Sequence, residues 1–152
     1  MTTNARNRIA APLLMAAIFF GTLTAQEAAA HNGEVHRPVA SEFGYGPRAS
    51  SSHLYTVTLT PAQPLRVRQL QTVNVLVSDA NGDPIDGALI RVDGGMPEHG
   101  HGLPTQPRVT RALGSGVYEI EGVRFSMGGW WEFKLVIESP WGNDRVTFNL
   151  SL

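Results

Sequence analysis

From residue 53 to the C-terminus, apolar and polar residues alternate in short stretches, each bounded by residues such as glycine, proline, asparagine or serine. A period of two places the apolar side chains on one face of a β-strand, and about seven such strands in about 100 residues are typical of a β-sandwich. No long stretch has the period of an amphipathic helix. The expected fold is therefore an all-β, immunoglobulin-like antiparallel sandwich. Its seven predicted strands are 54–60, 69–79, 88–93, 108–113, 117–125, 130–138 and 145–150.

The order of the predicted strands indicates which connections lie together. Successive antiparallel strands alternate in direction, so the first, third and fifth connections emerge at one end of the sandwich. The third connection is residues 94–107, GGMPEHGHGLPTQP, and the fifth is residues 126–129, SMGG. Four side chains are therefore expected to gather at this end: Met96, His99, His101 and Met127.

Residues 1–30 read as a targeting segment and not as part of the fold. Two arginines precede the apolar run 9–25, and a stretch of small residues ends at Ala30, in the order of a secretory signal peptide. Cleavage after Ala30 fits this pattern better than cleavage after Ala25, and gives a periplasmic or secreted protein. The alternative is that the segment is retained and anchors the protein in the inner membrane.

Residues 31–52 contain few apolar side chains and many glycine, proline and serine residues. Such a segment cannot bury enough apolar surface to offset the entropy lost on ordering. We therefore expect a flexible arm over 31–52, followed by the β-domain at 53–152.

Composition excludes several classes of function. The chain has no cysteine, which removes disulfides and leaves histidine, methionine and carboxylates as metal ligands. Its net charge of −1 gives no electrostatic reason to bind nucleic acid or an anionic membrane. The segment EHGH lacks the H-E-x-x-H spacing of zinc peptidases, and no G-x-S-x-G motif is present. We therefore expect no enzyme activity, and no small-molecule substrate is evident.

The segment EHGH is the strongest candidate site. In an extended backbone His99 and His101 point to the same side, and the intervening Gly100 allows both rings to approach one ion. Imidazole is the commonest protein metal ligand, and thioether sulfur with imidazole favours copper, Cu(I) above all. The sequence therefore predicts a copper site, with Met96 and Met127 as soft partners of the histidines. The competing interpretation is an ordinary surface loop that binds nothing.

The N-terminus offers one further candidate ligand. Cleavage after Ala30 would make His31 the first residue, and its α-amine and imidazole could together chelate Cu(II). His36 and His53 lie within reach along the arm. The competing interpretation is that these are ordinary solvent-exposed histidines.

Four segments together resemble the YtkA-like family, which is related in pattern to FixH-type proteins. They are Met96–Gly102, Pro104–Pro107, Gly114–Tyr118 and Met127–Trp131, and the resemblance covers about residues 54–150. It implies a small exported β-sandwich. The FixH-type relatives are associated with assembly of copper-containing respiratory oxidases. Members of the family are often anchored by a lipidated cysteine, which this chain lacks.

The sequence thus predicts a non-catalytic periplasmic module that binds copper for handling or delivery. The alternative is a metal-free interaction or assembly module that docks on a periplasmic or membrane protein complex.

Overall fold

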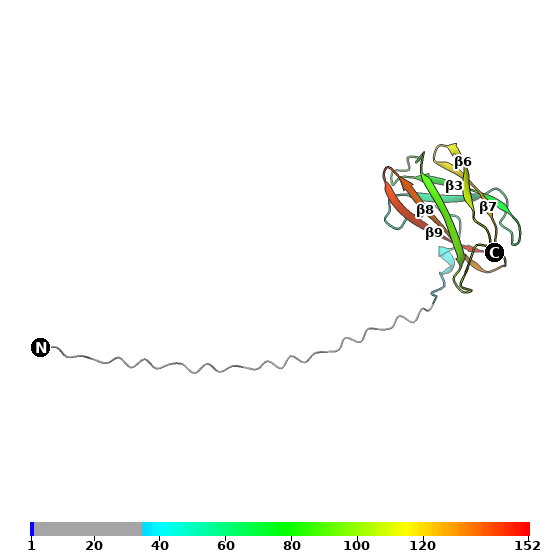
Figure 1. The fold of residues 1–152 in the computed structure, drawn as a ribbon, viewed down its shortest axis with the longest axis horizontal. Coiled ribbons are helices and arrows are strands. Elements are labelled where there is room, and N and C mark those ends of the chain that lie inside the picture. The colour runs from blue at the N-terminus through cyan, green and yellow to red at the C-terminus, as the bar shows by residue number, and fades with distance from the viewer. Residues whose placement is uncertain (2–34) are drawn as a thin grey trace. The chain divides into compact units, whose positions relative to one another are not determined.

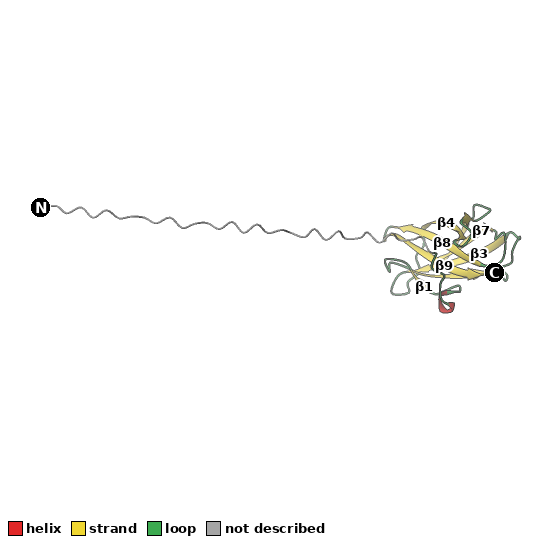
Figure 2. Cartoon of the chain, turned by 90° about the horizontal axis from the view of Figure 1, so that it is seen from below, coloured by secondary structure: helices red, strands yellow, loops and turns green. Residues whose placement is uncertain are grey.

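The computed structural model describes Met1 and residues 35–152, and the residues from 35 onward belong to one compact unit. This unit is all-β, with a single short 3-10 turn at Ala40–Glu42 (Figure 2). It contains nine strands joined in one sheet by antiparallel pairing. The strands are β1 (Arg48–Ala49), β2 (Thr56–Pro61), β3 (Gln71–Ser78), β4 (Leu89–Met96), β5 (His101–Gly102), β6 (Arg108–Gly114), β7 (Val117–Val123), β8 (Trp130–Ser139) and β9 (Gly142–Ser151).

Each of the seven predicted strands overlaps a strand of the structure, but the predicted number is too low. The additional strands β1 and β5 have two residues each, which is too short for an alternating pattern. Strand β4 also continues to Met96, beyond the predicted end at residue 93, and this extension brings part of the candidate loop into the sheet.

The strand order is β1-β2-β3-β7-β6-β4-β8-β9, with β5 paired to β4 outside this path. Figure 1 shows β8 beside β9 and β6 beside β7. The β8–β9 ladder has ten residue pairs, whereas β4 joins β6 through the single pair Arg91↔Arg108. Two well-paired groups of strands, β2-β3-β7-β6 and β4-β8-β9, are therefore joined by one thin link.

The segment before β2 closes the sheet between its two edges. Strand β1 pairs with β2, while Phe43 forms a parallel bridge with Asn149 of β9. The backbone N–H of Gly44 also donates to the carbonyl oxygen of Asn149, at 3.0 Å. The prediction of a flexible arm over 31–52 is therefore wrong for residues 43–52. Backbone pairing orders this part, and an argument from apolar content alone cannot detect it.

The core lies where the alternating pattern predicts it. Burying a large apolar side chain contributes about 1.5–3 kcal/mol to stability, so the buried apolar residues of the strands supply most of the driving force for folding. Twelve apolar residues of the alternating stretches are each at most 3% exposed: Val73, Val75, Val77, Tyr118, Ile120, Trp131, Phe133, Leu135, Ile137, Val146, Phe148 and Leu150.

The predicted signal peptide, residues 1–30, and the candidate ligand His31 lie outside the described residues. Within the residues that the structure describes, no helix is long and apolar enough to cross a membrane.

Candidate metal centre

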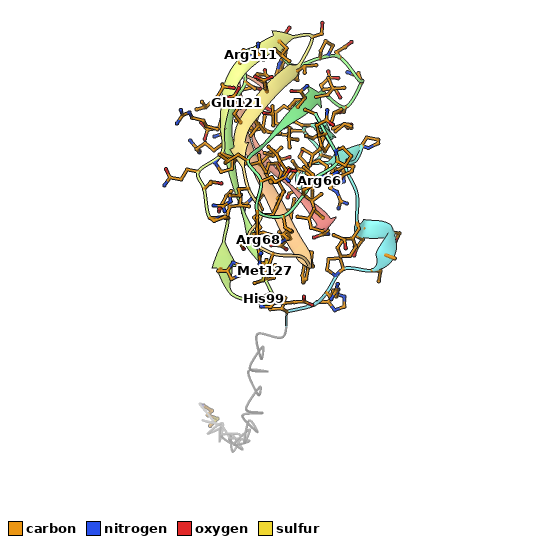
Figure 3. All side chains as sticks on the ribbon, turned by 90° about the vertical axis from the view of Figure 1, so that its right-hand side faces the viewer. Arg66, Arg68, His99, Arg111, Glu121 and Met127 are labelled. Atoms are coloured by element: carbon orange, nitrogen blue, oxygen red, sulfur yellow. The ribbon has the colours of Figure 1, made fainter. Side chains whose placement is uncertain are left out.

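Three connections meet at one end of the sheet, as the strand order predicts. They join β2 to β3, β4 to β6, and β7 to β8. Val67 of the first connection bridges to Phe125 of the third, and the Thr105 hydroxyl of the second donates to the Gly122 carbonyl oxygen at 2.7 Å. Figure 3 shows two of the predicted ligands at this end, His99 and Met127.

The segment MPEHGH folds as a tight hairpin between β4 and β5. Met96 and His101 are directly opposite each other in the ladder. Gly100 closes the turn at φ +66°, and its N–H donates to the Met96 carbonyl oxygen at 2.9 Å. A side chain at Gly95 would place its Cβ 2.6 Å from the carbonyl oxygen of His101, so glycine is required there for the two strands to approach.

His99 and His101 lie together at the exposed tip of this hairpin. Their ring centroids are 5.9 Å apart, and the ring planes differ by 29°. A metal about 2 Å from one nitrogen of each of two imidazoles holds the ring centroids about 5–6 Å apart. The observed spacing of the two ring centroids lies within this range, so the imidazoles are close enough to share one ion.

His101 has a second neighbour in Trp131, a fully buried residue near the start of β8. The two rings meet edge to face, with centroids 5.8 Å apart. On its other side, His101 Nδ1 lies 3.4 Å from the Gly102 carbonyl oxygen. A proton on Nδ1 makes this contact a hydrogen bond and leaves Nε2 free to bind a metal.

Met96 occupies a different position from the one expected of an open-loop ligand. Its side chain is 1% exposed and belongs to the hydrophobic core. A Cβ on Gly129, in the β7–β8 connection, would lie 2.9 Å from the Met96 Cε. Because directly opposite residues share a face of the ladder, Met96 lies on the same face as His101. Its thioether could reach an ion only from beneath the hairpin.

Met127 is more accessible, with 41% of its surface exposed. Its carbonyl oxygen accepts a hydrogen bond from Trp131 Nε1 at 3.0 Å. Trp131 therefore contacts both His101 and the backbone of Met127, and it joins the two loops that carry the predicted ligands. Alternation predicts that Trp131 is in the core, but its contacts at this end depend on the tertiary fold.

Glu98, the acidic residue of the segment EHGH, and His53 each have other contacts. Glu98 is held in an ion pair by Arg37, with 3.1 Å between Nη1 and Oε1. His53 lies in the turn before β2, and its N–H donates to the Ser50 carbonyl oxygen. Within the described residues, no three side chains of the types His, Cys, Asp or Glu are arranged to hold a metal. A site built from these residues therefore rests on two imidazoles and thioether sulfur.

Two carboxylates elsewhere in the sheet have shifted pKa values. Paired hydrogen bonds from Arg111, at 2.7 Å each, hold the pKa of Glu119 below its ordinary value. Burial acts to raise the pKa of Asp144. Hydrogen bonds from Ser50 and from the backbone N–H groups of Arg145, Ser52 and Leu54 outweigh that effect and lower it. Both carboxylates serve the fold and not the candidate site.

Comparison with known proteins identifies the family of this chain. Among solved structures, the chain is similar to the ZirS C-terminal domain, at 15% identity, covering 94% of this chain and 97% of that one, with a TM-score of 0.39. No curated protein matches it. The YtkA-like family model matches residues 50–136, more than half of the sequence, and this chain therefore belongs to the YtkA-like family.

Proposed function

We propose that this protein is a non-catalytic copper-binding module that handles or delivers the metal outside the cytoplasm. The observation that carries the proposal is the pair of exposed imidazoles of His99 and His101, with centroids 5.9 Å apart. Met127 on the neighbouring turn and Met96 beneath the hairpin supply two thioether sulfurs at the same end.

The donor set favours copper over the other common protein metals. Imidazole with thioether suits Cu(I), whereas Zn²⁺ in structural sites takes four strong ligands, and Mg²⁺ and Ca²⁺ take oxygen. The exposed hairpin tip keeps the ion accessible from one side, which suits transfer to another protein better than permanent storage.

We further propose an immunoglobulin-like arrangement of the sheet and export by the N-terminal segment. The grouping of strands on either side of the single pair Arg91↔Arg108 supports the first proposal. For export, the intact mass of protein recovered from its native compartment is expected to correspond to a chain that begins at His31. A mass that includes Met1 would contradict cleavage and favour the membrane-anchored alternative.

Copper binding is tested by titrating the protein with Cu(I) against a competing chelator. Replacing both His99 and His101 with alanine is expected to weaken binding at least 100-fold, about 2.7 kcal/mol. His53→Ala is the matched control, because it removes an exposed histidine at a distance from the hairpin. Equal affinity in the double variant and the wild type would reject the proposed site.

The alternative function is a metal-free docking module, and the exposed basic and apolar side chains at the same end favour it. In that case, the double histidine variant would bind any metal as weakly as the wild type does. Charge-reversing substitutions of the exposed Arg66 and Arg124 at this end would instead remove binding to a protein partner.

A further inference from the structure

A basic surface lies at the same end of the domain as the candidate metal centre. We define it by three exposed arginines, Arg66, Arg68 and Arg124. Val67 and Phe125 form a parallel bridge, so the residues that precede them, Arg66 and Arg124, are neighbours across the two connections. Figure 3 shows Arg68 at the same end of the domain as Met127 and His99.

The three arginines of the basic surface differ from most other basic side chains in having no acidic partner. Among the described residues, none of them has a carboxylate within the 4.0 Å that defines an ion pair here. Adjacent like charges on neighbouring segments repel each other, so the fold itself gains nothing from this placement. Four basic side chains elsewhere do form ion pairs with glutamates: Arg37, Arg91, Arg111 and Lys134.

Apolar side chains are also exposed in the connection that carries Arg66 and Arg68. Leu70 is 70% exposed and Val67 is 36% exposed. An open cleft of about 740 Å³ is lined in part by Arg66, Leu70 and Glu121. Such a mixture of arginine and exposed apolar side chains is characteristic of protein–protein interfaces, in which arginine is enriched.

The backbone holds this surface in place. Arg68 has φ +64°, which is uncommon for a residue other than glycine. Its N–H donates to the Phe125 carbonyl oxygen at 2.7 Å, and Phe125 packs edge to face on Trp131 with ring centroids 5.2 Å apart. The basic surface is therefore attached to the core through buried residues, and a partner would meet it already formed.

We propose that the basic surface docks a protein segment that presents carboxylates next to apolar side chains. The carboxylates would meet Arg66, Arg68 and Arg124, and the apolar side chains would cover Leu70 and Val67. The net charge of the chain is −1, so the attraction is local to this surface. The interspersed apolar side chains favour a protein segment over a small anion. The proposal does not depend on metal binding.

The test uses isotope-labelled protein and a hexapeptide that alternates glutamate and leucine. The amide signals of residues 62–70 and 123–127 are expected to shift, while the rest of the sheet stays unchanged. In the variant Arg66→Glu/Arg124→Glu, the peptide is expected to bind at least tenfold more weakly. The variant Arg108→Glu/Arg145→Glu is the control, since it changes two other exposed arginines by the same total charge.

Three outcomes would overturn the proposal. In the first, the shifts are absent or spread over the whole surface. In the second, the surface does not select an acidic protein segment. Either a peptide that alternates lysine and leucine binds equally well, or free citrate displaces the acidic peptide and gives the same shifts. In the third, vesicles containing phosphatidylglycerol bind with the same dependence on Arg66 and Arg124, which would identify a membrane surface and not a protein as the occupant.

Discussion

The closing segment, residues 43–54, and the β4–β5 hairpin, residues 94–103, are both rich in polar residues and glycine, yet they use their polar groups in opposite ways. In the closing segment the polar groups form hydrogen bonds within the fold. Asp144 is 7% exposed and accepts the N–H of Ser52 at 2.9 Å, and the Ser50 hydroxyl donates to the Tyr55 carbonyl oxygen at 3.1 Å.

In the hairpin, by contrast, the polar groups that hold the fold are those of the backbone. The Gly100 N–H donates to Met96, and the Leu103 N–H donates to the Gly94 carbonyl oxygen at 3.0 Å. The imidazoles at the tip make a single long polar contact, that of His101 at 3.4 Å. The difference indicates that the polar side chains of the closing segment maintain the fold, while the histidines of the hairpin remain available to a ligand.

The largest expected effect concerns the closing segment. Replacing Asp144 with alanine leaves the partly buried backbone N–H groups of Ser52, Leu54 and Arg145 without their acceptor, and we expect a loss of about 2–4 kcal/mol in the free energy of unfolding. Asp79→Ala is the control, because its carboxylate also accepts backbone N–H groups but in an exposed turn, and about 1 kcal/mol or less is expected. Urea denaturation measures both. Equal losses of stability in the two variants would contradict the claim that Asp144 matters more to the fold than a carboxylate in an exposed turn.

Acid is expected to destabilise the fold through Asp144 and Glu119, and neither of these carboxylates belongs to the hairpin. The folded-state pKa values of Asp144 and Glu119 are lowered, so the folded protein binds fewer protons than the unfolded chain. Their stabilisation is complete above about pH 4.5, the range in which unfolded carboxyls have ionised, and is lost as pH falls through the folded values. Denaturation at a series of pH values should therefore show a fall below this range that is shallower in Asp144→Ala. A parallel dependence in wild type and variant would contradict this account.

The contribution of Trp131 to copper binding at the hairpin is tested by substituting two adjacent tryptophans. Trp131 Nε1 donates to the Met127 carbonyl oxygen, whereas the equally buried Trp130 donates to Asn149 Oδ1 at 3.1 Å. Each substitution by phenylalanine removes one indole hydrogen bond. We expect Trp131→Phe to weaken Cu(I) binding about tenfold and Trp130→Phe to change it less than twofold, because a factor of ten needs about 1.4 kcal/mol. Equal effects would show that only general stability had been measured.

The smallest effect is expected from Met127. Replacing it with leucine keeps its size and removes its sulfur, and a soft but weak ligand of this kind should be worth about threefold in Cu(I) affinity. Leu113→Met, at an exposed position on β6, is a control that adds a thioether at a distance from the hairpin. An unchanged affinity in Met127→Leu would leave the imidazoles, with Met96, as the ligands to be considered.

The sequence predicts the parts of the structure that a repeated pattern determines, but not the parts that depend on a single tertiary contact. Alternation predicted the core of β8 and β9 because each strand offers several inward positions. It could also have located Met96, which continues the inward series of Ile90 and Gly94. The pairing of Phe43 with Asn149 could not be predicted, because two residues distant in the chain meet there without any apolar pattern.

The candidate site shows the same division. Strand direction predicted that the loops of His101 and Met127 share one end, since this follows from the alternating direction of the seven longer strands. The role of Trp131 as the link between them depends on side-chain packing. The neighbourhood of Arg66 and Arg124 depends on one isolated bridge, for which the sequence contains no signal.

X-ray absorption on the Cu(I)-loaded protein tests the central claim most directly, because it counts the nitrogen and sulfur atoms around the metal. The account predicts two imidazole nitrogens and at least one sulfur in the wild type. It also predicts that the multiple-scattering signal of imidazole disappears in the His99→Ala/His101→Ala variant and persists in His53→Ala. A spectrum without imidazole, or one that the double substitution leaves unchanged, would contradict the claim that the hairpin binds copper.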